Sequence, residues 1–109
     1  MQIEEVLRSM GKTLADDPNC GYTQLHINMC KQTLIDYEKG LSGAGGDYNK
    51  IMKCVKHAVL GLNKADKKAQ FSLIKTAQSA ALRSFIHEKA FAAGLKPTDE
   101  DITELWSDW

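Results

Sequence analysis

The sequence predicts an all-α protein, because its apolar residues recur at helical spacing and no segment has the pattern of a strand. Short segments with glycine or proline separate the helical runs, as expected for connections in a helical bundle. We expect a compact bundle of about five helices around one long central helix. A chain of 109 residues suffices for one hydrophobic core, so residues 1–109 are expected to form a single domain.

The first two helices are predicted over residues 2–15 and from Thr23 to Lys39. Two glutamates fall in the first turn of the first helix, where negative charge is favourable. Thr23 is a candidate cap of the second helix, and Gly40 is its stop signal. The predicted buried stripes are Ile3, Val6, Leu7, Met10 and Leu14 in the first helix, and Ile27, Cys30, Leu34, Tyr37 and Leu41 in the second.

A glycine-rich connector, residues 42–46, precedes a third helix that Asp47 caps. The connector is not a phosphate-binding loop, because no Gly-Lys-Ser/Thr follows it and no strand precedes it. The row of lysines on the back of this helix is either a solvated face or a surface for an acidic partner. The apolar stripe is Tyr48, Ile51, Met52, Val55, Val59 and Leu62, and the opposite face carries Lys50, Lys53, Lys56 and His57.

The run from Asn63 to Gly94 has no helix breaker, and we predict one continuous helix of about 30 residues, about 45 Å long. Asn63 with Asp66 can cap its start, and Gly94 with Pro97 signals its end. Apolar residues lie on two of its faces, so it is expected to have neighbours on both sides. Gln78 lies within one of these faces and must find hydrogen-bond partners, which favours a structural role over a place in a recognition surface.

A last helix is predicted over residues 98–109, because Thr98 and Asp101 have the spacing of a capping box. Its apolar residues fall at i, i+3, i+4 and i+7. Either the helix docks its tryptophans on the bundle, or it is an acidic, aromatic tail held out for the groove of a partner. The candidate partner-binding residues are Trp106, Trp109, Asp101 and Glu104.

Lysine plus arginine and aspartate plus glutamate both number 14, so general binding to nucleic acid or membrane is not expected. The charge is uneven, since Lys50 to Lys75 holds seven lysines and one aspartate, whereas Asp99 to Asp108 holds five carboxylates. No apolar run is long enough to span a membrane, and the first 20 residues lack a secretory-signal pattern. We expect a cytosolic protein if Met1 is the native start, and a periplasmic one if a signal peptide was removed.

The sequence offers no catalytic constellation, because no serine or cysteine has a histidine at a spacing that implies a nucleophile and its base. We therefore expect a protein that is not an enzyme and needs no cofactor. One alternative is a zinc site, since two helices would each supply a histidine and a cysteine. Its four candidate ligands are His26, Cys30, Cys54 and His57.

The three cysteines leave the disulfide pattern open. In an oxidising compartment we favour a bridge between Cys20 and Cys30, which would close a loop of about ten residues. A bridge from Cys30 to Cys54 would instead join the second and third helices. In the cytosol all three are expected to be ordinary thiols.

Three segments resemble a known family. Residues 20–30, Cys-Gly-Tyr-Thr-Gln-Leu-His-Ile-Asn-Met-Cys, are similar to the cysteine-framed opening of the small periplasmic LprI-type lysozyme-inhibitor proteins. Residues 73–85, with Ala77-Gln78 followed by Phe85, and residues 48–51 resemble later segments of that family, although Ala81 stands where the family has tryptophan. The resemblance implies a helical protein without catalysis that binds and blocks a cell-wall-cleaving enzyme, with Cys20 and Cys30 bridged.

The predicted function is therefore that of a non-enzymatic binding protein of inhibitor or immunity type, which neutralises a toxin or a lysozyme-like hydrolase. An alternative is a cytosolic adaptor, derived from a phage or an effector, whose last helix engages a host protein. A zinc-binding helical module is the remaining alternative.

Overall fold

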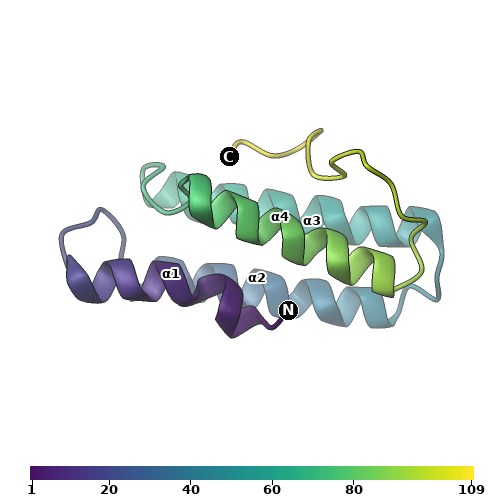
Figure 1. Cartoon of the computed structure of the whole chain (residues 1–109), viewed down its shortest axis with the longest axis horizontal. Coiled ribbons are helices and arrows are strands. Elements are labelled where there is room, and N and C mark those ends of the chain that lie inside the picture. The colour runs from purple at the N-terminus through teal and green to yellow at the C-terminus, as the bar shows by residue number, and fades with distance from the viewer.

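The computed structural model describes residues 1–109 and consists of α-helices and turns without strands, so the predicted all-α class is confirmed (Figure 1). It contains four helices where the sequence predicted about five. The molecule is elongated, with a longest dimension of 43 Å. The helices are α1 (Ile3–Asp16), α2 (Gln24–Ser42), α3 (Tyr48–Lys68) and α4 (Thr76–Ala92), and residues 93–109 form a C-terminal segment of turns.

The four helices form a bundle in which α2 and α3 pair as a hairpin and α1 packs against both α2 and α4. In Figure 1, α1 and α2 form the lower layer and α3 and α4 the upper one. The C-terminal segment runs back along the top of the upper layer, over α3 and α4. No helix combines the length and the apolar character that crossing a membrane requires.

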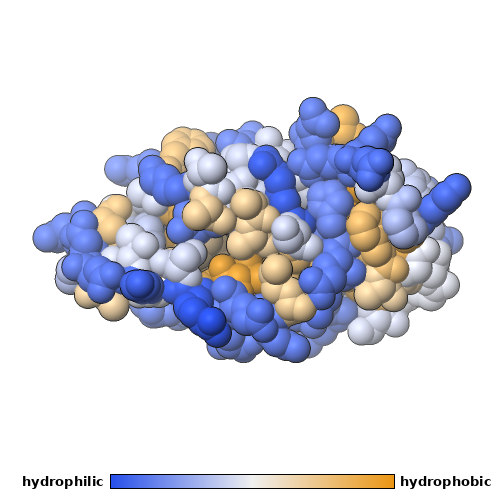
Figure 2. All heavy atoms as spheres, viewed as in Figure 1, coloured by the Kyte–Doolittle hydropathy of each residue, from blue (hydrophilic) through white to orange (hydrophobic).

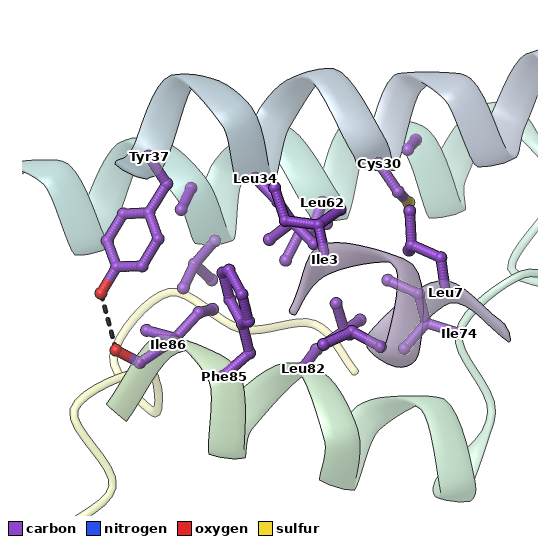
Figure 3. Packing of buried hydrophobic residues seen from close by; sticks show 14 of the residues in the cluster. Ile3, Leu7, Cys30, Leu34, Tyr37, Leu62, Ile74, Leu82, Phe85 and Ile86 are labelled. Carbon is purple, nitrogen blue, oxygen red and sulfur yellow. Dashed lines mark hydrogen bonds between the residues drawn. The ribbon is translucent and has the colours of Figure 1, made fainter. Parts of the chain in front are cut away.

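The hydrophobic core lies between the two layers, and the predicted stripes of α1, α2 and α3 supply most of it. Figure 3 shows Tyr37 of α2 reaching across to α4, where its hydroxyl donates to the carbonyl oxygen of Ile86 at 2.7 Å. Burial of this phenol raises its pKa well above the ordinary value. Phe85 is fully buried beside it, with the two ring centroids 6.4 Å apart.

The predicted continuous helix from Asn63 to Gly94 is wrong, because the chain reverses direction between α3 and α4. A straight helix of that length would extend beyond the other helices and leave Leu73 and Ile74 without neighbours. In the folded-back chain both side chains are buried, at 1% and 6% exposure. The burial of apolar surface therefore outweighs the helical propensity of an uninterrupted segment.

The buried side chain of Asp66 stabilises this reversal of the chain. Its Oδ1 atom accepts the backbone N–H groups of Leu73 at 3.1 Å and Ile74 at 2.9 Å. Gln70 and Phe71 adopt the left-handed conformation, with φ of 56° and 62°, although neither is glycine. Asp66 thus acts within the loop after α3 and not as the first-turn partner of Asn63 that the sequence suggested.

The predicted last helix over residues 98–109 is also wrong. Asp101 does not return a bond to Thr98; its Oδ1 accepts the N–H of Thr103 at 2.9 Å and the Thr103 hydroxyl at 2.6 Å. The side chain therefore holds a local turn, which competes with helix formation. Thr103 itself is fully buried, so this turn faces the bundle.

Candidate protein-binding groove

The C-terminal segment leaves α4 at Gly94, whose φ of +114° strongly favours glycine. A Cβ atom at Gly94 would lie 3.1 Å from the Cα atom of Gly46 in the connection between α2 and α3. The N–H of Leu95 donates to the carbonyl oxygen of Ala90, and the Leu95 side chain is buried. This turn directs the following residues over the beginning of α3.

Asn63 attaches the end of the segment to the later turns of α3. Its Nδ2 donates to the carbonyl oxygen of Trp106 at 2.6 Å, and its Oδ1 accepts the N–H of Asp108 at 3.1 Å. One side-chain amide therefore satisfies a backbone acceptor and a backbone donor of the segment. The sequence reasoning placed Asn63 at a helix start and missed this role.

His87 attaches the middle of the segment to α4. Its Nε2 accepts the N–H of Ile102 at 3.1 Å, while its Nδ1 lies 2.7 Å from the carbonyl oxygen of Arg83. The ring also packs edge-on against Phe91, with centroids 5.8 Å apart. No sequence pattern signals this role, because the bonds join residues 15 positions apart through a segment without periodic structure.

Arg83 provides a second attachment on α4. Its Nε lies 3.2 Å from Oδ2 of Asp101, and its Nη2 donates to the carbonyl oxygen of Trp109. The Nε–H is not directed at an acceptor, so the contact with Asp101 is an ion pair without a hydrogen bond. The guanidinium also lies over the Trp109 ring, 5.1 Å from its centroid.

Asp101 is held in its charged form by these neighbours. Partial burial alone would raise the pKa of this carboxyl, but the two hydrogen bonds from Thr103 and the charge of Arg83 outweigh it. The net effect is a pKa below the ordinary value. The carboxylate of Asp101 therefore contacts Thr103 and Arg83 within the chain.

The structure therefore separates the four predicted partner-binding residues. Trp106 and Trp109 are partly buried and pack against the core, as in the docking interpretation of the sequence. The Nε1 atom of Trp109 is buried and has no hydrogen-bond partner. Only Glu104 is exposed and lies in a groove, together with the inward-bonded Asp101.

This groove has a volume of about 830 Å³. It lies between the first turns of α3 and the C-terminal segment. Two apolar side chains stand exposed at its rim, Tyr48 at 64% and Leu105 at 84%. Figure 2 shows a hydrophobic group projecting among hydrophilic ones at the top right, where the C-terminal segment runs in Figure 1. The lining residues are Tyr48, Met52, Leu95, Lys96, Thr98, Asp99, Glu100, Asp101, Ile102, Glu104 and Leu105.

The groove is negatively charged, and three of its four carboxylates form no ion pair. Asp99, Glu100 and Glu104 are exposed and form no ion pair, while Lys96 is the only cation in the lining. The acidic end of the chain is visible in the sequence, but the helical spacing predicted Tyr48 to lie in the buried stripe. The position of Tyr48 in the first turn of α3, next to the connector, is the signal that would have placed it at a rim.

Gln78 and the cysteines lie away from this groove. Gln78 is buried, accepts the N–H of Lys75 at 3.1 Å and donates to the hydroxyl of Ser9 on α1 at 3.2 Å. It thus caps α4 and links it to α1. All three cysteines are free thiols in the structure, with no bridge between Cys20 and Cys30.

The predicted zinc alternative is wrong, because no group of three or more histidine, cysteine or acidic side chains is placed to hold a metal ion. His26 instead caps its own helix, where its Nδ1 accepts the N–H of Thr23 at 3.0 Å. Cys30 is fully buried in the core, and burial with the nearby charge of Asp66 raises its pKa to about 12.

A smaller crevice of about 350 Å³ lies between α2 and α3 and contains Cys54, His57 and Asp36. No hydrogen bond joins these three side chains, so they do not form a nucleophile with an oriented base. Two glycines in its lining let the helices approach each other closely. A Cβ atom on Gly61 would lie 2.8 Å from Thr33 Cγ2, and one on Gly40 would lie 2.9 Å from Cys54 Sγ.

Comparison with known proteins gives no family for this chain: no family model, curated protein or solved structure matches it. The groove is therefore the feature that indicates a function. Free carboxylates beside exposed apolar side chains can bind a surface that is both basic and apolar.

Proposed function

We propose that this protein is a non-enzymatic binding protein of inhibitor or immunity type, which blocks a partner protein through the acidic groove. The observation that carries the proposal is the exposure of Tyr48 and Leu105 beside carboxylates that have no partner within the chain. Exposed apolar side chains rimmed by polar ones are typical of protein-binding surfaces. The occupant is accordingly a segment of the partner that combines lysine or arginine with an apolar side chain.

The two kinds of side chain have different roles in this proposal. Ion pairs at an exposed rim contribute about 0–1 kcal/mol each, so Asp99, Glu100 and Glu104 mainly speed association and select a basic partner. Burial of Tyr48 and Leu105 against the partner provides most of the affinity, about 1.5–3 kcal/mol for a fully buried large apolar side chain. Binding is therefore expected to weaken, but not to vanish, at high salt.

The class of partner follows the resemblance to the lysozyme-inhibitor proteins and the chemistry of the groove. The proposed partner is a hydrolase or toxin with a basic patch near its active site. A hydrolase agrees with the resemblance, and the basic patch complements the acidic groove. The adaptor alternative required a free last helix, and that helix is not formed.

Binding to lysozyme-type hydrolases and to candidate toxins, measured by calorimetry together with their residual activity, tests the proposal. We expect a dissociation constant below about 100 μM for at least one basic partner, with loss of its activity. The double variant Leu105→Asp/Glu104→Lys is expected to weaken binding at least about tenfold. The matched control is Leu25→Asp/Glu5→Lys, because Leu25 is 66% exposed on α2 and both residues lie outside the groove.

Two results would overturn the proposal. One is the absence of binding tighter than about 100 μM to any candidate. The other is equal weakening by the groove variant and by the control, which would place the binding surface elsewhere. Deletion of the whole C-terminal segment is unsuitable as a test, because Thr103 is buried and the segment covers part of the core.

A further inference from the structure

The outer face of α3 carries a row of lysines that the proposed function leaves unused. Lys53, Lys56, Lys64 and Lys67 are exposed, and none of them forms an ion pair. Their spacing of three, eight and three residues keeps them on one side of the helix. Leu60 lies within the row and is 43% exposed. This face thus combines positive charge with an apolar side chain.

No acidic residue of α3 neutralises this row. The only carboxylate within the helix is Asp66, which is buried and bonded to the loop before α4. The net charge of the chain is nevertheless zero, because the compensating carboxylates are concentrated elsewhere, including the groove. The chain therefore presents two separate patches of opposite sign, and each contains an exposed apolar side chain.

Both patches are built on the same helix. Tyr48 and Met52 of the first α3 turns line the groove, and the lysine row continues along the later turns. From Met52 to Lys64 the helix rises about 18 Å. Two copies with antiparallel α3 helices can therefore place each groove against the lysine row of the other at the same time. A contact of this kind has two-fold symmetry and closes on itself.

We infer that a second copy of this chain occupies the groove in solution. In this dimer, Asp99, Glu100 and Glu104 of one copy lie against the lysine row of the other, and Leu60 of each copy packs toward Tyr48 and Leu105 of its partner. The two contacts are equivalent by symmetry. Because its ion pairs are exposed, the dimer has modest affinity and dissociates as salt increases.

The inference goes beyond the proposed function, since it needs no foreign partner. It also adds a consequence for that function, because a basic partner must displace the second copy to enter the groove. The two ideas are tested separately: the experiment below uses this protein alone, and its failure leaves binding of a foreign partner to the calorimetric test.

Sedimentation velocity from about 10 μM to about 1 mM, in about 20 mM and about 500 mM salt, measures the association. We expect the mass at low salt to rise from 12.1 kDa toward twice that value, and to return to 12.1 kDa at high salt. Two charge-reversed variants test the contact. The row variant is Lys56→Glu/Lys64→Glu, and the groove variant is Asp99→Lys/Glu104→Lys, which leaves the internally bonded Asp101 in place.

Each variant alone is expected to associate at least about tenfold more weakly than the native chain, because like charges then face each other. An equimolar mixture of the two is expected to associate again, since the acidic row of one faces the basic groove of the other. The control Lys12→Glu/Lys31→Glu reverses two exposed charges on α1 and α2 and is expected to dimerise normally. Circular dichroism confirms that each variant is folded.

A native chain that remains at 12.1 kDa at high concentration and low salt would overturn the inference. Two further results would overturn it equally. One is association that neither charge-reversed variant weakens, and the other is a mixture of the two variants that does not associate. In either case the groove and the row would not be the contacting surfaces.

Discussion

Nε2 of His87 accepts the backbone N–H of Ile102 at 3.1 Å, and Nδ1 of the same ring lies 2.7 Å from the carbonyl oxygen of Arg83. A carbonyl oxygen only accepts, so Nδ1 is the donor and Nε2 the acceptor. The imidazole therefore joins the backbone of α4 to the backbone of the C-terminal segment. This connection holds the C-terminal segment, which forms one wall of the groove, against α4.

Replacement of His87 by alanine is expected to loosen the C-terminal segment, because the N–H of Ile102 loses its acceptor. The expected cost is about 1–2 kcal/mol in the free energy of unfolding. Hydrogen exchange at the Ile102 amide should accelerate at least about tenfold. His57→Ala is the control, since His57 is exposed and makes no hydrogen bond. Unchanged exchange at Ile102 would contradict the attachment.

The lowered pKa of Asp101, to which the hydrogen bonds from Thr103 and the charge of Arg83 contribute, predicts a dependence of stability on pH. Because the folded-state pKa of Asp101 is lowered, its contribution is present above the unfolded value of about 3.9 and is lost as the pH falls through the folded value. Asp101→Asn should cost about 0.5–1 kcal/mol at pH 7, since the side chain is 33% exposed. Urea unfolding should show this difference shrinking below about pH 4. A difference that persists there would show that the charge of Asp101 does not contribute to stability.

The reversal between α3 and α4 depends on the buried carboxylate of Asp66. Asp66→Ala leaves two backbone N–H groups without an acceptor and is expected to cost about 2–4 kcal/mol. Asp66→Asn keeps an oxygen at the same position and should cost clearly less. Urea unfolding of the two variants checks this order, and equal losses would indicate that the charge is what matters.

Gly61 is expected to tolerate no side chain, although alanine is the better helix former. A Cβ atom there would lie 2.8 Å from Thr33 Cγ2, and the Thr33 hydroxyl is bonded to the carbonyl oxygen of Met29, which restricts its movement. Gly61→Ala should therefore destabilise by about 1–3 kcal/mol. Gly11→Ala on α1 meets no atom within 4 Å and should stabilise by about 0.5–1 kcal/mol. Thermal unfolding of both variants measures the contrast.

The three cysteines are expected to differ in reactivity. Cys30 is fully buried with a pKa raised to about 12, so a thiol reagent should modify it only after unfolding. Cys20 and Cys54 are partly exposed and should react in the folded protein. Intact mass without reductant measures the number of labels. Two thiols that resist labelling even in denaturant would show a disulfide, against the free thiols of the structure.

The sequence predicted the first three helices because each has a single apolar stripe and a recognisable start. Asp47 does cap α3, accepting the N–H of Lys50 at 3.0 Å. The end of α3 was missed because no glycine or proline marks it: Gln70 and Phe71 supply the left-handed turn. The physical cause lies in tertiary structure, since only the burial of Leu73 and Ile74 and the bonds to Asp66 make that turn favourable.

The groove was predicted less well than the helices. The acidic character of residues 99–108 can be read from composition, and Glu104 does lie in the groove. The C-terminal segment forms one wall of the groove, and its position depends on Asn63, Arg83 and His87. These residues belong to two helices and bond to backbone atoms of this irregular segment. Bonds of this kind have no period in the sequence, so neither propensity nor spacing indicates them.

Both tryptophans of the chain, Trp106 and Trp109, belong to the C-terminal segment and lie partly buried against the bundle. The tryptophan fluorescence of this protein therefore originates where the segment meets α3 and α4. Lifting the segment would expose both indoles to water and shift their emission to longer wavelength, while the rest of the helical bundle contributes no signal of its own in that range. The native chain thus contains its own optical probe for the wall of the groove, and no label has to be added.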